Sequence, residues 1–97
     1  MKKSYTKTKT SCRVTFEVPA EMGAETVSVA GEFNEWDKDA HPLKKRKGGR
    51  FSRTIYLDSG QEYRFRYWVD GDHWENDWEA DKYVPNEFGS EDSVVVT

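Results

Sequence analysis

A run of acidic residues in the carboxyl-terminal half of the chain is the first set of side chains that could do chemistry. It comprises Asp70, Asp72, Glu75, Asp77, Glu79 and Asp81. A carboxylate pair from this run could act as acid and base in glycoside hydrolysis. The run occupies a turn and the loop after it, however, where charged side chains are usually solvated. We therefore interpret it as solvated loop charge.

Other patterns that would indicate catalysis or metal binding are missing from the sequence. The acidic run does not have the spacing of an EF-hand loop. His41 and His73 stand alone, and we expect His41, which precedes Pro42, at the surface. Neither a Gly-rich phosphate loop nor a nucleophile elbow is present. The sequence therefore predicts a protein that is not an enzyme and that holds no metal and no cofactor.

The tryptophans, with a neighbouring arginine, indicate a different chemistry. Sugar rings have an apolar face that stacks on an aromatic ring, with about 1 kcal/mol for such a contact beyond area burial. Trp36 lies in a polar loop and Trp74 follows a tight turn, while the forked guanidinium of Arg66 could reach two vicinal hydroxyls. The alternative is that a small β domain uses tryptophan as core filler, and for Trp36 the two interpretations are equally weighted. Trp78 has no predicted place.

One hairpin must position several of these residues. Residues 63–69 alternate strictly, with aromatic or aliphatic side chains on one face and Arg66 and Trp68 on the other, which is typical of a strand with one buried face. Asp70-Gly71 follows, and this pair favours a type I′ turn because both central residues need positive φ. His73 and Trp74 then begin a return strand. Trp68 is therefore predicted to lie opposite the core.

The remaining segments predict further short strands. Residues 11–18 alternate with Cys12 inward, and further strands are expected over 26–30, just after Leu43, and over 50–57 and 93–97. Residues 75–89 are predicted to be irregular, and residues 1–10 to be a mobile tail. Seven to eight short strands with turn signals between them indicate an all-β fold, an antiparallel β-sandwich, formed by a single domain over residues 11–97.

Composition restricts the partners of this domain. The chain has 97 residues and a formal net charge of −3, which argues against a nucleic-acid binder. A single cysteine excludes an intrachain disulfide. Apolar runs long enough for a membrane span are absent, and the lysines of the run 44–47 are interpreted as protection of a sheet edge. We expect a cytoplasmic monomer without nucleic-acid or membrane partners.

Three stretches resemble carbohydrate-binding module family 48. Residues 27–36 (VSVAGEFNEW) resemble the family's V-x-(apolar)-x-G-x-F-N-x-W segment. Residues 63–71 (YRFRYWVDG) resemble its Y-x-(Y/F)-K-(F/Y)-x-V-D-G segment, and residues 88–96 (FGSEDSVVV) its L-G-x-x-N-(N/S)-strand segment. The family's domains are immunoglobulin-like, of the early-set type. They precede the barrel of glycogen-branching and debranching enzymes and form the glycogen-binding part of the AMP-activated protein kinase β-subunit.

The resemblance implies a non-catalytic module that binds an α-glucan such as glycogen or starch. Trp36 and Trp74 match the family's stacking tryptophans, and Arg66 matches its sugar-contacting lysine. Phe88 matches the leucine that enters the glucan ring. Ser90 matches the small hydroxyl residue and Asp92 the amide that reaches sugar hydroxyls. Departures are a one-residue insertion before Trp74, Arg for Lys, Asp for Asn, and Trp78 where the family has proline after Asp77.

Two alternatives to an independent sugar-binding module stay open. The same fold could be a protein-interaction or regulatory module with a degenerate sugar site, which would present a large apolar patch away from Trp36 and Trp74. It could also be the amino-terminal module of a glycoside hydrolase family 13 enzyme, or associate with a glucan-metabolising enzyme. Trp68 matches no family contact, so it is either an extra platform or a residue covered by the amino-terminal segment.

Overall fold

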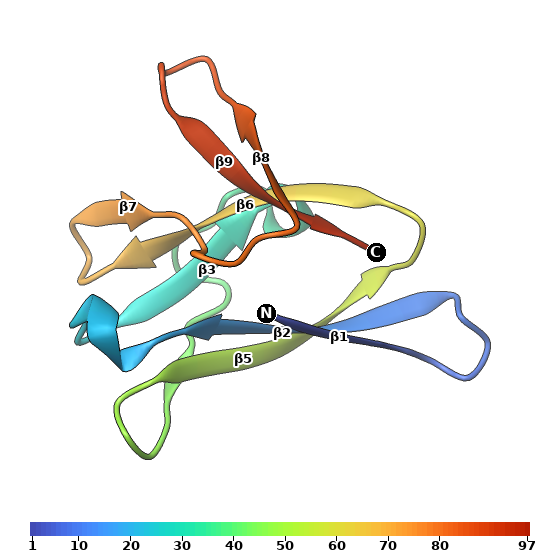
Figure 1. The fold of residues 1–97 in the computed structure, drawn as a ribbon, viewed down its shortest axis with the longest axis horizontal. Coiled ribbons are helices and arrows are strands. Elements are labelled where there is room, and N and C mark those ends of the chain that lie inside the picture. Colours follow the sequence, from blue (N-terminus) through green and yellow to red (C-terminus); the bar gives the residue numbers. More distant parts are fainter.

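Two antiparallel sheets make up the computed structural model, which describes all 97 residues (Figure 1). One sheet has the order β1 (Lys2–Tyr5), β2 (Ser11–Val18), β5 (Phe51–Asp58), β4 (Lys44–Lys45). The other has the order β3 (Val27–Gly31), β6 (Glu62–Val69), β9 (Glu91–Val96), β8 (Lys82–Pro85), and β7 (His73–Glu75) also pairs with β6. Short 3₁₀ turns, η1 (Ala20–Met22) and η2 (Glu32–Asn34), flank β3. The predicted all-β, immunoglobulin-like sandwich is confirmed.

The core lies between the two sheets and follows the alternation of the sequence. Cys12, Val14, Phe16 and Val18 of β2 are buried, as are Phe65, Tyr67 and Val69 of β6. The rings of Phe16 and Phe65 meet edge to face across the sheets, with centroids 5.0 Å apart. Inward-facing side chains of β6 thus fill the core, and its outward-facing side chains are left for the opposite surface.

The hairpin of β6 and β7 has the predicted turn. Asp70 and Gly71 both have positive φ, 55° and 67°, as a type I′ turn requires. The Asp70 carboxylate also accepts hydrogen bonds from the backbone N–H groups of Glu25 (2.7 Å) and Thr26 (3.0 Å). These two bonds hold the pKa of Asp70 below its ordinary value. The turn therefore fastens the hairpin to the start of β3.

The amino-terminal segment differs from the mobile tail predicted for residues 1–10. Lys2–Tyr5 form β1 and pair with Thr15–Cys12 of β2. Lys3 Nζ lies 2.8 Å from Asp81 Oδ2, and the Tyr5 hydroxyl donates to the Thr97 carbonyl at 2.6 Å. A Lys/Thr-rich stretch carries no hydrophobic pattern, and besides the adjacent strand β2 its partners Asp81 and Thr97 come from the other end of the chain.

The region predicted to be irregular also contains a strand. Lys82–Pro85 form β8, which pairs with β9. The prediction failed because β8 is a short edge strand with an exposed Tyr83 and ends at proline, which is tolerated at sheet edges. With β1 and β8 the fold has nine strands, where seven to eight were predicted.

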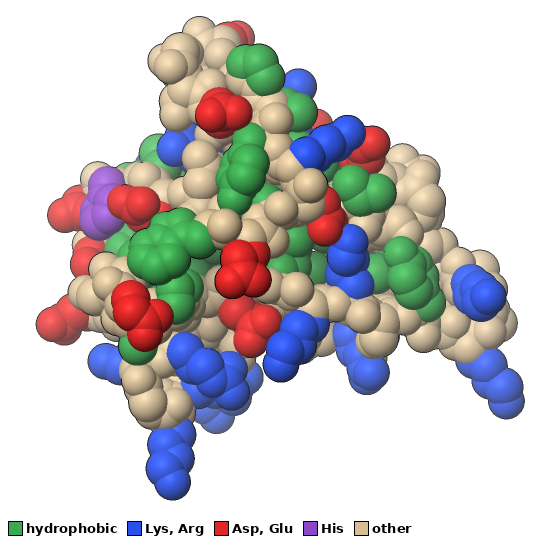
Figure 2. Space-filling model, in the orientation of Figure 1, with side chains coloured by type: hydrophobic (Ala, Val, Ile, Leu, Met, Phe, Trp, Pro, Cys, Tyr) green, Lys and Arg blue, Asp and Glu red, His purple; other side chains and the backbone are tan.

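Charge is distributed unevenly between the sheets. Lysines lie on both edge strands of the first sheet, β1 and β4, where they oppose edge-to-edge association. Figure 2 shows Lys and Arg side chains along this sheet and most acidic side chains elsewhere. No helix in the structure is long and apolar enough to cross a membrane.

Candidate carbohydrate-binding groove

An open groove of about 890 Å³ lies on the outer face of the second sheet. Its lining residues come from η2 and the turn after it, from β6 and β7, and from the β8–β9 hairpin. They are Glu32, Trp36, Arg64, Arg66, Trp74, Pro85, Asn86, Glu87, Phe88 and Asp92. Five of the six residues predicted for a sugar site are among them, although they are far apart in the sequence.

Three tryptophans form a row beside the groove. Trp68 and Trp74 are direct cross-strand partners, with ring centroids 4.8 Å apart. Trp36 meets Trp74 at 6.3 Å and a near-perpendicular angle of 83°. The Lys38 ammonium lies 3.8 Å from the Trp68 ring centroid, within cation–π range. Trp68 therefore supports Trp74 and is capped by Lys38, while Trp36 and Trp74 line the groove itself.

Trp68 lies on the outer face, as predicted, but the amino-terminal segment does not cover it. β1 belongs to the other sheet, whereas Trp68 is on β6. Its partial burial comes from Trp74 and Lys38. The alternative that Trp68 is covered by the amino-terminal segment is wrong.

The turn that carries Trp36 has an unusual backbone. Glu35 and Trp36 both adopt positive φ, 56° and 58°, a conformation that is rare for bulky residues and needs support from surrounding contacts. Asn34 provides them: its Oδ1 accepts from the Gly31 N–H at 2.9 Å, and its Nδ2 donates to the Val29 carbonyl at 3.0 Å. Asn34 thus fixes the turn that presents Trp36.

Replacing Asn34 with alanine should lower the free energy of unfolding by about 1–2 kcal/mol, because partly buried backbone groups lose their partners. The Trp36 indole should become more mobile, which heteronuclear relaxation of its side-chain N–H would detect. Ser28→Ala, on the neighbouring strand β3 but outside this network, is the matched control. Unchanged Trp36 relaxation in Asn34→Ala would contradict the assigned role.

His41 is partly buried and bonded, and so differs from the surface residue that was expected. Its Nδ1 lies 2.8 Å from Asn34 Nδ2, so the neutral ring accepts a hydrogen bond from the amide. Burial, followed by the nearby Arg53 guanidinium, lowers the pKa of His41 below its ordinary 6.5. Protonation at Nδ1 would remove the acceptor that helps to hold the Trp36 turn.

The contribution of His41 to the free energy of unfolding should therefore fall on mild acidification. The contribution of His41 is fully present above pH 6.5, where the ring is neutral in both states. It is lost as the pH falls through 6.5 towards the lower folded-state pKa, because the unfolded chain takes up the proton first. Urea unfolding of wild type and His41→Gln between pH 7.5 and 5, on the order of one unit either side of the unperturbed value, would measure the difference.

His73 also changes the pH dependence of stability, so the contribution of His41 must be measured as the difference between wild type and His41→Gln. The Asp72 carboxylate, in contact with the His73 ring, raises the pKa of His73. Its contribution is present below pH 6.5 and is lost as the pH rises through the folded-state pKa, which is the opposite sign. Identical pH dependence in wild type and His41→Gln would contradict the prediction for His41.

Charged side chains form the floor of the groove. Arg64 Nη1 lies 3.8 Å from Asp92 Oδ2, and Asp92 Oδ1 accepts from Asn86 Nδ2 at 3.1 Å. Glu32 Oε1 accepts from the Arg64 backbone N–H at 2.6 Å, continuing the ladder beyond the end of β3. The Nε of Arg66 is buried and has no hydrogen-bond partner, so it is a donor left unmatched within the protein.

The tip of the β8–β9 hairpin forms one wall. Asn86 Oδ1 accepts from the backbone N–H groups of Phe88 (3.0 Å) and Ser90 (3.1 Å), which closes the turn. Phe88 is 84% exposed. The structure offers no reason for an aromatic ring to be so exposed. Ser90 lies in the same turn but does not line the groove, so it is the one predicted contact that the fold leaves outside.

Sequence reasoning missed several lining residues. Arg64 carried a signal, because it is two residues before Arg66 and therefore on the same face of β6. Glu32, Pro85, Asn86 and Glu87 carried none, since the elements on which they lie were predicted as loops. Asp77, interpreted as solvated, is in fact only 4% exposed.

The groove combines aromatic faces with closely spaced donors and acceptors of both signs. Two guanidinium groups lie among three carboxylates and one amide, which favours a neutral ligand rich in hydroxyl groups over a strongly anionic one. Nowhere does the structure gather three or more His, Cys, Asp or Glu side chains in an arrangement that could hold a metal ion.

Comparison with known proteins identifies the family. The family described as the glycogen recognition site of AMP-activated protein kinase matches residues 14–95, most of the chain and all of the groove. A search of curated proteins gives no match. The matched region spans both sheets and the loops that carry Trp36, Trp74 and Phe88. The chain therefore belongs to the glycogen-recognition family of carbohydrate-binding modules.

Proposed function

We propose that the groove binds an α-glucan without transforming it. The observation that carries the proposal is the convergence of Trp36, Arg66, Trp74, Phe88 and Asp92, from five separate segments, on one surface. The two groove tryptophans are nearly perpendicular, so their faces are turned relative to one another. Such platforms fit a curved chain better than a flat ribbon, which favours α-linked over β-linked glucose.

In the proposed complex, Trp36 and Trp74 stack on successive glucose rings. The guanidinium of Arg66, which lines the groove, donates to ring hydroxyls, and Asp92 accepts from them. Phe88 projects from the hairpin tip towards the inner side of the curved chain. Tight packing of an exposed aromatic ring against a sugar explains why the hairpin presents Phe88 to solvent.

Titration with sugars tests this proposal. Maltoheptaose, followed by ¹H–¹⁵N spectra, should shift the indole N–H signals of Trp36 and Trp74 and the backbone signals of residues 86–92. Cellohexaose, the matched β-linked control, should shift them little. The absence of any change with maltoheptaose at millimolar concentration would overturn the proposal. Equal responses to the two sugars would overturn the α-linkage preference.

We also propose that the module acts beside an enzyme of glucan metabolism. The groove can bind a glucan but has no set of residues arranged for catalysis. The module would therefore serve to hold an enzyme on a polymeric substrate. Effective concentration then raises the apparent affinity of the enzyme for the polymer without new contacts at the active site. Co-purification of such an enzyme on glycogen only when the module's groove is intact would test this role.

A further inference from the structure

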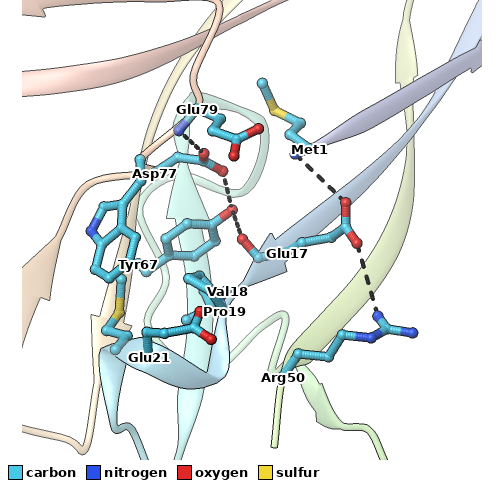
Figure 3. A pocket seen from close by; sticks show the side chains of 11 residues that line it. Met1, Glu17, Val18, Pro19, Glu21, Arg50, Tyr67, Asp77 and Glu79 are labelled. Atoms are coloured by element: carbon cyan, nitrogen blue, oxygen red, sulfur yellow. Dashed lines mark hydrogen bonds and ion pairs between the residues drawn. The ribbon is translucent and has the colours of Figure 1, made fainter. Parts of the chain in front are cut away.

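A second cleft has a volume of about 340 Å³, and Figure 3 shows the side chains that line it. Its lining comes from Met1, from the end of β2 and η1, from Arg50, from Tyr67 of β6, and from the segment after β7. Tyr67 points to the inner face of β6, whereas Arg66 and Trp68 point to the outer face. The cleft is therefore on the opposite side of the second sheet from the groove, and none of its lining residues is shared with the groove.

Trp78 is one of the residues that line the cleft. Trp78 is 56% exposed, and Figure 3 shows the cleft bounded by Asp77, Glu79 and Glu21 around Tyr67. Hydrophobic side chains are also exposed next to acidic ones over the connection after β7 (Figure 2). A tryptophan that served as core filler would be buried, so the exposure of Trp78 has no structural explanation.

The neighbours of Trp78 are anchored unusually well for a loop. Asp77 is 4% exposed; its Oδ2 accepts from the Tyr67 hydroxyl at 2.6 Å and its Oδ1 from the Glu79 N–H at 2.8 Å. The Asp77 N–H donates to Ser93 Oγ at 2.9 Å, and the Tyr83 hydroxyl donates to the Asp77 carbonyl at 2.6 Å.

The hydrogen bond between Tyr67 and Asp77 has a fixed direction. Burial, with the adjacent Asp77 carboxylate, raises the pKa of Tyr67 well above its ordinary value, so its hydroxyl remains a donor. Burying a carboxylate is unfavourable unless it is fully hydrogen-bonded. The hydrogen bonds of the buried Asp77 therefore fix a segment whose next residue, Trp78, is exposed to solvent.

The rim of the cleft resembles the groove in chemistry. Glu17 is engaged by Arg50 Nη1 at 3.8 Å, and the Arg50 side chain is 54% exposed, so it retains donors. Glu21 and Glu79 make no ion pair in the structure and offer free acceptors. One indole face with nearby carboxylates and a guanidinium is the combination that meets both the apolar face and the hydroxyl rim of a sugar ring.

We propose that this cleft is a second carbohydrate site, which holds one hexose unit against Trp78 with its hydroxyl groups towards Glu21, Glu79 and Arg50. The choice of glucose as the hexose rests on the proposed function, whereas the existence of the site does not. With two sites on opposite sides of one sheet, a single module binds two chains, or two branches, of a glucan polymer. Its affinity for the polymer then exceeds its affinity for a short sugar through avidity.

Variants of the two sites separate the proposals. In the double variant Trp36→Ala/Trp74→Ala, maltotriose should still shift the Trp78 indole N–H and the backbone signals of Met22 and Glu79. In Trp78→Ala, maltotriose should shift only groove signals, and glycogen affinity should fall about tenfold or more while maltotriose affinity at the groove is unchanged. Trp78→Phe, which keeps a smaller platform, should show an intermediate loss on glycogen.

Each result decides between the possibilities. If the Trp78 signals of wild type do not shift with millimolar maltotriose, the proposal of a second site is overturned, whether or not the groove signals shift. If they respond to N-acetyl-lysine methylamide and not to the sugar, the cleft binds a cationic side chain and the carbohydrate assignment is overturned. If they respond to sugar while groove signals do not, the groove proposal fails and the second site stands.

Discussion

Replacing Trp74 with alanine should weaken maltoheptaose binding by about 2 kcal/mol, or roughly thirtyfold in Kd. The ring centroid of Trp74 lies 6.3 Å from that of Trp36 and 4.8 Å from that of Trp68. Removal of Trp74 therefore deletes one aromatic platform and leaves the other, Trp36, without its aromatic neighbour. Isothermal titration calorimetry, or Trp fluorescence where affinity is low, would measure the change. We expect a loss of similar size from Arg66→Ala, because hydrogen bonds to a charged group contribute about 1.5–3 kcal/mol.

The control for Trp74→Ala is Trp74→Phe, which keeps an aromatic face and should lose much less affinity. Thermal unfolding of both variants separates binding from folding, since Trp74 lies on the outer face and not in the core cluster. Equal affinity of wild type and Trp74→Ala, with the fold intact, would show that the sugar does not stack on this ring.

Replacing Gly31 with alanine should destabilise the domain by about 3 kcal/mol. A Cβ at this position would lie 2.4 Å from the Arg64 carbonyl oxygen, 2.8 Å from Phe65 Cβ and 2.9 Å from Phe33 Cε2. The carbonyl cannot move away without disturbing the β3–β6 ladder, in which Gly31 pairs with Phe65. The effect is steric, because the φ of −169° at Gly31 is ordinary extended backbone.

The unfolding midpoint of Gly31→Ala should fall by more than about 10 °C, as measured by circular dichroism. Gly60→Ala is the matched control. A Cβ at Gly60 meets no atom within 4 Å, but its φ of 75° disfavours alanine, with a cost of about 1 kcal/mol. Gly31→Ala should also weaken sugar binding, since Gly31 begins the turn that presents Trp36. A smaller loss of stability than in Gly60→Ala would contradict the steric argument.

Local pattern was sufficient for much of the fold. Strict alternation over residues 63–69 identified β6 and its inner face, and Asp70-Gly71 identified the turn after it. Both features depend only on residues that are neighbours in the sequence. The same alternation placed Arg66 and Trp68 on the outer face. The resemblance of three short motifs to the family indicated five of the residues that line the groove, although the sequence does not show that they lie close together.

Two short strands without a clear hydrophobic pattern escaped prediction. β1 and β8 each pair with the next strand in the chain, β2 and β9. β1 is also held by Asp81 and Thr97, which are far away in the sequence, and β8 by the Asp77 carbonyl. The roles of Asn34 and Asn86 were missed as well. Their amides satisfy backbone groups of particular turns, and a sequence does not show which turns will be left with unpaired groups.

The sequence by itself determined which residue types are available for the proposed sugar site: tryptophan rings, an arginine beside them and a short aromatic hairpin tip. Tertiary structure alone decided which of them meet. Strand pairing within the second sheet brought Trp36 to Trp74 and Phe88, made Trp68 the cross-strand neighbour of Trp74 and left Ser90 outside the groove. It also left Asp77 buried next to an exposed Trp78. The physical reason is that side-chain identity is local, whereas burial and proximity arise only when strands distant in the sequence pair.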